Sequence, residues 1–447
     1  MNTAVISLII FGICIVLFVW NRLSAATVAL MGLVAMILFG CCTFSEGFKH
    51  FGSSTVVLIC AMMVVGRATF DTGLAELIGN KVIQLARGDE RSIVVLGTLV
   101  TAVISAFLSN IATLAIMISI MTSVCSTNQT VKFKNVIMPI SIAAVIGGSA
   151  TLIGSTTQLT GQGILESYLG AGNGFSFTTF TIPGMLIILL LVLYVAFIGY
   201  PLGIKIWGNS KDYNQSPEQS ASSENVDKAG RITDGDQVTT KSKSKMITMS
   251  VIFVLTVIAF VMTDQIKKFI PNFDLAIVSV ISALACVLTG CITHKNAIKS
   301  INWNLGVWFC SSLGLAEGLN LSGGGELMAN FFINLIGKDS NPFLLFAGFV
   351  IFVTVLTQFL SNSTVLTILL PIALPICGEM GYNAYSFAVG MTLAAAMAVV
   401  TPLANTTIGM SMIANYKFID YFKYAGPFTA LAVGIILVIV PLLWPLA

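Results

Sequence analysis

The chain has 447 residues, of which 56% are apolar and only 9% are charged, and its mean hydropathy is +0.94. A soluble chain would need about a quarter of its residues charged, so the composition excludes a soluble globular protein and predicts one embedded in a lipid bilayer. The net charge of +3 is small, which argues against a nucleic-acid partner.

Apolar segments follow one another along the chain in two matching sets. The first set is 4–20, 25–41, 54–70, 92–125, 134–160 and 178–204. The second set is 246–263, 274–292, 302–320, 342–376, 384–412 and 425–445. Since a helix needs ~20 apolar residues to span a bilayer, we predict an all-α polytopic membrane protein with two halves, 1–207 and 246–447.

The fourth segment of each half, 92–125 or 342–376, is too long for one span and has a Ser-Asn pair near its middle. We expect each to be a re-entrant hairpin. The alternative is two full spans joined by a tight turn, with each arm at the short limit. With hairpins, each half has five crossings and the protein about ten spanning helices. An odd number of crossings inverts the second half relative to the first, which is a common transporter plan.

Short polar motifs, called polar words below, interrupt these segments at corresponding places in the two halves. Phe-Leu-Ser-Asn at 107–110 returns 252 residues later at 359–362, and Ser-Thr-Thr at 155–157 returns as Asn-Thr-Thr at 405–407. In a membrane protein, interrupted segments at matching places in two halves indicate a transport site.

The distribution of Lys and Arg among the predicted loops predicts the membrane topology. With the N-terminus outside, seventeen Lys and Arg residues fall inside and only Lys49, Lys267, Lys268 and Lys338 fall outside. Positive residues collect on the cytoplasmic side, so we expect both termini outside in a cell membrane. The polar segment 208–245 is expected to be a disordered cytoplasmic linker. Residues 73–87 have the pattern of a short interfacial helix.

The interrupted segments carry almost no charge. Between 92 and 163 the charged residues are Lys132 and Lys134, and between 342 and 414 the one charged residue is Glu379; all three lie in predicted loops. Proton pumps and Na⁺/H⁺ exchangers place ionisable groups at the midplane, so these classes are disfavoured. Hydroxyls, amides, helix N-termini and free carbonyls remain, and they suit an anion together with Na⁺.

Other readings of the residue types stay open. Ser and Asn at helix breaks also cap backbone groups or bond to neighbouring helices without any ligand. The nine cysteines lie in or beside apolar segments and are expected to be small buried hydrophobes. Two histidines between segments do not suggest a metal site. We expect no enzyme activity and no organic cofactor, because no nucleophile is paired with a base.

These polar words resemble those of the divalent anion/Na⁺ symporter family within the ion transporter superfamily. That family has Ser-Asn-Thr at both hairpin tips and a Gly-Ser/Thr-Pro-Pro-Asn-like word at each broken helix. The resemblance covers nearly the whole chain. It implies a homodimer, an elevator-type motion of a transport domain, and a small anionic substrate carried with Na⁺.

The resemblance also implies site residues. Sodium ligands would come from both halves: Ser105, Ser109, Asn110, Gly154, Thr357, Leu360, Asn362 and Ala404. Substrate contacts would come from polar residues at the same breaks: Ser109, Asn110, Thr156, Ser361, Asn362, Ser363, Asn405 and Thr406.

The chain departs from the family pattern at several of these positions. The Thr of the first tip is Ile111 and that of the second is Ser363, while Thr-Thr pairs at 156–157 and 406–407 replace Pro-Pro. The usual Thr or Ser beside the second pair is Asn405. Ile111 removes a hydrogen-bond donor and adds bulk, which favours a smaller or less polar anion.

Several functions fit this sequence. We expect Na⁺-coupled symport of a dicarboxylate, tricarboxylate or sulfate-like anion. A Na⁺-independent anion exchanger or arsenite-type permease of the same superfamily is the first alternative. A membrane sensor that signals through the linker, or a channel, is the alternative from another class. Arg67 and Glu317, 250 residues apart, are expected to anchor helix ends at the interface or to form ion pairs that change during motion.

Overall fold

The computed structural model describes residues 2–20, 22–74, 89–128, 130–170, 172–208, 243–270, 273–336, 341–403 and 405–447. Within these ranges all regular secondary structure is helical, with no β-strand. The predicted all-α polytopic class is confirmed. The predicted linker 208–245 lies almost wholly outside the described residues, as does most of the predicted interfacial helix 73–87.

The first half runs through a series of helices that matches the predicted segments. Its elements are α1 (Thr3–Trp20), α2 (Ala25–Leu38), α3 (Phe44–Phe48), α4 (Ser54–Asp71), α6 (Glu90–Ser105), α7 (Asn110–Thr127), α8 (Phe133–Gly147), α9 (Thr156–Leu169), α10 (Thr181–Tyr194) and α11 (Tyr200–Trp207). A π-helical turn, Val195–Gly199, joins α10 to α11.

The second half repeats this order. Its elements are α14 (Lys243–Val261), α15 (Thr263–Lys267), α16 (Leu275–Leu288), α17 (His294–Ser300), α18 (Trp303–Leu321), α19 (Gly324–Ile336), α20 (Pro342–Leu356), α21 (Asn362–Met380), α22 (Ala384–Ala395), α23 (Thr406–Met410) and α24 (Phe418–Leu443).

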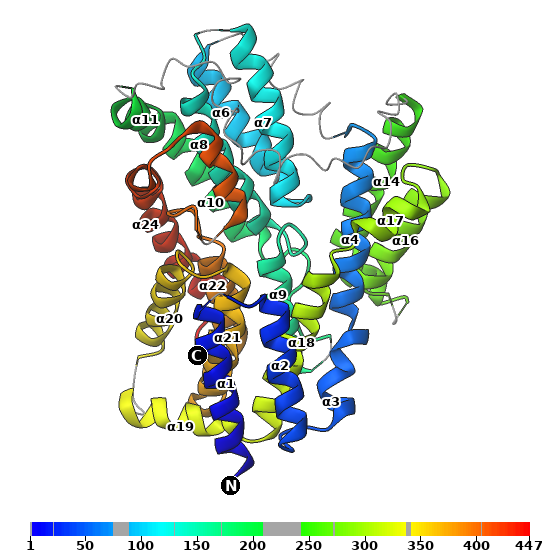
Figure 1. Ribbon diagram of the computed structural model, residues 1–447, viewed down its shortest axis with the longest axis vertical. Helices are drawn as coiled ribbons and strands as arrows, with labels where there is room; N and C mark the ends of the chain where they lie inside the picture. Colours follow the sequence, from blue (N-terminus) through cyan, green and yellow to red (C-terminus); the bar gives the residue numbers. More distant parts are fainter. Residues whose placement is uncertain are drawn as a thin grey trace.

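Each half contains one helical hairpin and one broken helix, as the polar words predicted. Helices α6 and α7 form the first hairpin, and α20 and α21 form the second. The two hairpins lie toward opposite ends of the molecule (Figure 1). In the first half the helix breaks between α8 and α9, after a 3₁₀ turn at Gly148–Ala150. In the second half it breaks between α22 and α23.

The helices pack in two groups. In one group α2 packs against α18, α4 against α16, and α14 against both α4 and α16. In the other group α6 and α7 pack against α8, α20 and α21 against α22, and α10 and α22 against α24. Helix α9 contacts α4 and α18 of the first group as well as α21 and α22 of the second, and it lies between the groups in Figure 1.

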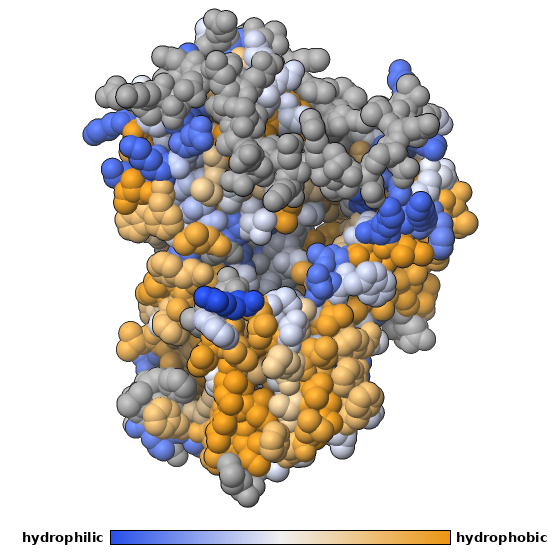
Figure 2. Space-filling view, viewed as in Figure 1, coloured by the Kyte–Doolittle hydropathy of each residue, from blue (hydrophilic) through white to orange (hydrophobic). Residues whose placement is uncertain are grey.

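Length and hydropathy agree with a membrane setting. Among the described residues, six helical stretches are long and apolar enough to cross a bilayer: Phe44–Asp71, Phe133–Ala150, Thr181–Trp207, Lys243–Val261, Asn362–Met380 and Phe418–Leu443. Shorter apolar helices accompany them, including α1, α2 and α16. Figure 2 shows apolar side chains over α1 and α2 on the lower part of this face, and paler, more polar ones around its hollowed centre.

The hairpin is positioned by a close helix contact. All of α8 is buried, and Gly147 at its end lies directly against the backbone of Ala102 in α6. A Cβ atom at Gly147 would lie 2.2 Å from the Ala102 carbonyl oxygen and 2.6 Å from its Cα. The absence of a side chain therefore sets the distance between the first hairpin and the helix that breaks.

Replacing Gly147 by alanine is expected to lower the melting temperature of the purified protein. The added methyl would meet backbone atoms, so a helix must move, and overpacking of this kind costs about 1–3 kcal/mol. The matched control is Gly434→Ala, because no atom lies within 4 Å of the Cβ at that exposed position in α24. Equal melting temperatures for the two variants would contradict the importance of this contact.

Candidate functional site

The first polar cluster joins the hairpin tip to both sides of the broken helix. Ser105, the last residue of α6, is fully buried and its hydroxyl donates to the Ala144 carbonyl oxygen of α8 at 2.5 Å. The side-chain amide of Asn110, the first residue of α7, faces three oxygen atoms. With its nitrogen toward them it donates to Ser105 Oγ (2.9 Å), Ala144 O (3.1 Å) and Gly154 O (3.2 Å).

The second cluster repeats this arrangement in the other half. Thr357, directly after α20, is fully buried. Its hydroxyl donates to the Ala395 carbonyl oxygen at the end of α22 (3.0 Å) and lies 3.3 Å from Asn362 Oδ1 at the start of α21. The Leu360 backbone belongs to the turn of this hairpin, and Ala404 lies outside the described residues.

A further pair of links is also duplicated. The Thr151 hydroxyl donates to the Ala106 carbonyl oxygen in the first half, and the Thr401 hydroxyl donates to the Gln358 carbonyl oxygen in the second. Because each hydroxyl comes from the break and each carbonyl from the hairpin turn, the same bond fastens the hairpin to the break twice.

Five of the eight predicted sodium ligands meet in the two clusters. Ser105, Asn110 and Gly154 come together in the first half, and Thr357 and Asn362 in the second. Ser109 precedes α7 but is exposed and makes no capping bond. Whether these groups bind Na⁺ stays a prediction.

The predicted substrate residues lie at accessible positions. Ser109, Thr156, Ser361 and Thr406 are exposed, and Asn110, Asn362, Ser363 and Asn405 are half-buried. The clusters thus have two layers. Buried hydroxyls and carbonyls form the inner layer, while accessible hydroxyls and amides form the outer one.

Helix starts contribute to the outer layer. The Ser155 hydroxyl caps α9 by accepting from the Thr157 N–H (3.2 Å), and Asn405 Oδ1 caps α23 by accepting from the Thr407 N–H (2.9 Å). Ser361 caps α21 by accepting from the Thr364 N–H at 3.3 Å. Such starts carry unpaired N–H groups and a partial positive charge.

The two halves meet crosswise at these breaks. Helix α7 of the first hairpin packs against α23 of the second half, and α21 of the second hairpin packs against α9 of the first. Each hairpin therefore contacts the break of its own half at the turn and the short helix of the other half beyond it. Both hairpins are therefore in contact with the other half of the chain.

Arg67 and Glu317 occupy equivalent helices but have different partners. Arg67 Nε lies 2.7 Å from Asp71 Oδ1, one turn further along α4. Glu317 is buried in α18, pairs with Lys49 Nζ at 2.7 Å and accepts from the Ser167 hydroxyl of α9 at 2.8 Å. Glu317 thus links α18 to α9, which the sequence did not indicate.

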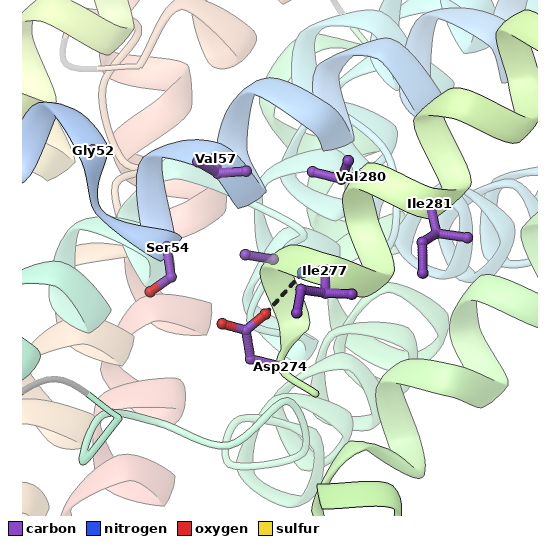
Figure 3. A pocket seen from close by; sticks show the side chains of 8 residues that line it. Gly52, Ser54, Val57, Asp274, Ile277, Val280 and Ile281 are labelled. Atoms are coloured by element: carbon purple, nitrogen blue, oxygen red, sulfur yellow. Dashed lines mark hydrogen bonds between the residues drawn. The ribbon is translucent and has the colours of Figure 1, made fainter. Parts of the chain in front are cut away.

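A groove of about 350 Å³ lies apart from the repeated words, between the N-terminal ends of α4 and α16 (Figure 3). The one charged residue among those lining it is Asp274, whose carboxylate accepts from the Ile277 N–H at 2.8 Å. That bond caps α16. Since the remaining lining is mainly apolar and includes none of the repeated words, the groove is not our candidate for the transport site.

The sequence reasoning missed Gln358, and it did not foresee the contact between Gly148 and Asn110. Gln358 follows Thr357 and bonds to the second break, and its amide in an otherwise apolar stretch was the available signal. Gly148 lies against Asn110, with a would-be Cβ 2.5 Å from the side-chain amide. No sequence pattern separates this contact from ordinary helix packing.

The helical fold with paired polar breaks is that of a membrane transporter. Residues 15–366 match the family model described as citrate transporter (CitMHS), and the chain belongs to that family.

This chain is also similar to individual known transporters. The chain is 22% identical to the "Uncharacterized transporter YfbS" of Escherichia coli (strain K12), covering 98% of both chains. It is 23% identical to the "Sodium-dependent dicarboxylate transporter SdcS" of Staphylococcus aureus (strain MW2), covering 87% of this chain and 76% of the relative. Its fold is similar to the crystal structure of the YdaH transporter of Alcanivorax borkumensis, with a TM-score of 0.62, 13% identity and coverage of 91% and 88%.

Gly148→Ala is expected to reduce transport at least tenfold with little change in expression. The new Cβ would lie 2.5 Å from the Asn110 amide and 2.9 Å from the Gly154 carbonyl oxygen, so the amide must leave the cluster. Losing two or three hydrogen bonds of about 1 kcal/mol each accounts for this size of effect. Uptake of labelled citrate and succinate into proteoliposomes measures it. Gly12→Ala, with no atom near its Cβ, is the control, and equal uptake by both variants would contradict the expectation.

Proposed function

We propose that this protein is a secondary active transporter that carries a small di- or tricarboxylate, or a sulfate-like anion, together with Na⁺. The observation that carries the proposal is the duplicated cluster: a buried hydroxyl, a hairpin-tip Asn and a helix-end carbonyl, present once in each half. The similarity to a protein named a sodium-dependent dicarboxylate transporter supports both the cation and the anion class.

The inner layer suits a cation because it is made of oxygen atoms. Ser105 Oγ, Ala144 O and Gly154 O converge on the nitrogen of the Asn110 amide. That nitrogen occupies the place of a positive partner, which Na⁺ would take when bound. If the Asn110 amide then rotated, its own oxygen would join these three as a ligand. Na⁺ favours such carbonyl and side-chain oxygens at broken helices.

The outer layer suits an anion. Exposed hydroxyls at Ser109, Ser361 and Thr406 supply donors, and the starts of α9 and α21 supply partial positive charge. The region has no fixed cation of its own, so a bound Na⁺ is the main source of attraction for a carboxylate. At low dielectric this Coulomb attraction is large, which makes anion binding depend on Na⁺.

Alternating access follows from the two helix groups. We propose that the group containing the hairpins and breaks moves as a unit past the group containing α2, α4, α16 and α18, by an elevator-type motion. The contacts of α9 with both groups mark where the groups slide. In this proposal the protein is a homodimer in a cell membrane, both termini face outside, the hairpins are re-entrant, and residues 208–245 are cytoplasmic.

The competing functions predict different behaviour. An exchanger or arsenite-type permease ignores Na⁺, and an exchanger also needs an anion on the opposite side. A sensor loses its function when residues 210–240 are deleted, whereas a transporter keeps its uptake. A channel shows neither saturation nor counterflow.

Replacing Asn110 or Asn362 by alanine is expected to abolish Na⁺-driven uptake, because each amide completes one cluster. Uptake of labelled citrate, succinate and sulfate would be measured in proteoliposomes with and without an inward Na⁺ gradient. The matched control is Asn173→Ala, whose exposed amide donates to the Leu169 carbonyl oxygen, at the end of α9 and away from the hairpin turns. Wild-type uptake that ignores Na⁺ but requires an anion on the opposite side would replace symport with exchange.

Ile111→Thr is expected to shift preference toward dicarboxylates. Ile111 is 44% exposed, directly after Asn110, so a hydroxyl there would face the anion. A hydrogen bond to a charged group contributes about 1.5–3 kcal/mol, which corresponds to a change of roughly tenfold or more in relative KM. Competition between labelled citrate and unlabelled succinate would report it. Ile111→Val, which keeps the position apolar, is the control, and an unchanged preference in Ile111→Thr would remove Ile111 from the specificity argument.

A further inference from the structure

Gln358 makes contacts that none of the described residues of the first half reproduces. Its side-chain nitrogen donates to the Thr354 carbonyl oxygen (2.8 Å) and to the Met397 carbonyl oxygen (2.9 Å). Its side-chain oxygen accepts from the Val400 N–H at 3.0 Å. The side chain is 8% exposed. One amide therefore binds two backbone groups of the broken segment and one of its own helix.

These backbone groups need a partner because the second break is long and buried. Helix α22 ends at Ala395 and α23 begins at Thr406. Residues 396–400 are all buried. An unpaired backbone group in such surroundings costs a large part of a hydrogen bond, since water does not reach it.

The first break is held differently. Ala106 takes the place of Gln358 there, because it directly follows Ser105 as Gln358 follows Thr357. The 3₁₀ turn Gly148–Ala150 continues from α8 and keeps part of the helical bonding, whereas 396–405 contains no helical residue among those described. Both halves share the bond from a threonine hydroxyl of the break to the hairpin turn, whereas a glutamine amide that bonds from the hairpin to backbone groups of the break is present, among the described residues, in the second half alone.

We infer that Gln358 is a positioning residue for the second cation cluster. By fixing Met397 and Val400, it sets where the chain leaves α22, and so keeps the Ala395 carbonyl oxygen beside Thr357 and Asn362. The inference rests on the proposed Na⁺-coupled function. It assigns the positioning of one of the two proposed cation sites to a single side chain. The second site depends on this amide, and the first does not.

Gln358→Met tests the inference, because methionine keeps the length of the side chain and makes none of the three hydrogen bonds. Reconstituted full-length protein is used. The half-saturating Na⁺ concentration, the anion KM and Vmax are measured separately, together with the rise in melting temperature that Na⁺ alone produces in detergent. We expect half-saturating Na⁺ to rise about tenfold and the Na⁺-induced rise in melting temperature to shrink. Gln265→Met, at an exposed position in α15, should match the wild type.

A second variant keeps the test decisive if Gln358→Met does not fold. Gln358→Glu is neutral in these buried surroundings, so it retains the acceptor for Val400 and can donate to one of the two carbonyl oxygens, and we expect a smaller shift in the same direction. Half-saturating Na⁺ equal to that of Gln265→Met in both variants would overturn the inference. A loss of Vmax with unchanged half-saturating Na⁺ would also overturn it, since that pattern marks a purely structural role. A wild type indifferent to Na⁺ in both measurements would instead overturn the proposed function, and the inference with it.

Discussion

The structure depends on the need to satisfy buried backbone where a helix is broken inside a bilayer. Water does not reach such a segment, so each freed carbonyl and N–H needs a partner from the protein or a ligand. The hairpin turns meet this need in both halves: Ser105 and Thr357 donate to the last carbonyls of the helices that break, and Thr151 and Thr401 donate back to the turns. The groups that hold the fold are therefore the same groups that a cation would use.

The two halves use different residues to satisfy the buried backbone at their breaks. In the first half, two glycines allow the close contacts. Gly147 lets α8 pack directly against α6, and Gly148 leaves room for the Asn110 amide. In the second, a longer break is held by the side chain of Gln358. Both halves share the bonds from Thr151 and Thr401 to the hairpin turns, while the remaining contacts differ. The two proposed cation sites are then expected to differ in rigidity, and hence in affinity, although their ligand types are alike.

Much of the fold was accessible from the sequence because apolar length and polar interruption are local signals. The predicted segments coincide with helices, and 107–110 and 359–362 lie at the turns between α6 and α7 and between α20 and α21. That Ser105 and Asn110 belong to one site was implied by the family resemblance, and the structure brings the two side chains together. Crosswise packing of α7 on α23, the contact of Gly148 with Asn110 and the partners of Glu317 did not follow. These are long-range contacts, and a single sequence carries no record of which distant residues meet.

A site without fixed charge also explains how coupling is enforced in the proposed function. If a lysine or arginine lay among the polar words, it would attract the anion whether or not Na⁺ was present, and the carrier could move half-loaded. Here the charged residues of 92–163 and 342–414 are confined to Lys132, Lys134 and Glu379, outside the words. An anion in this neutral site lacks a counter-charge until Na⁺ binds. The inner layer must then fill before the outer layer holds its ligand, so the order of binding is a consequence of which residues are absent from the site.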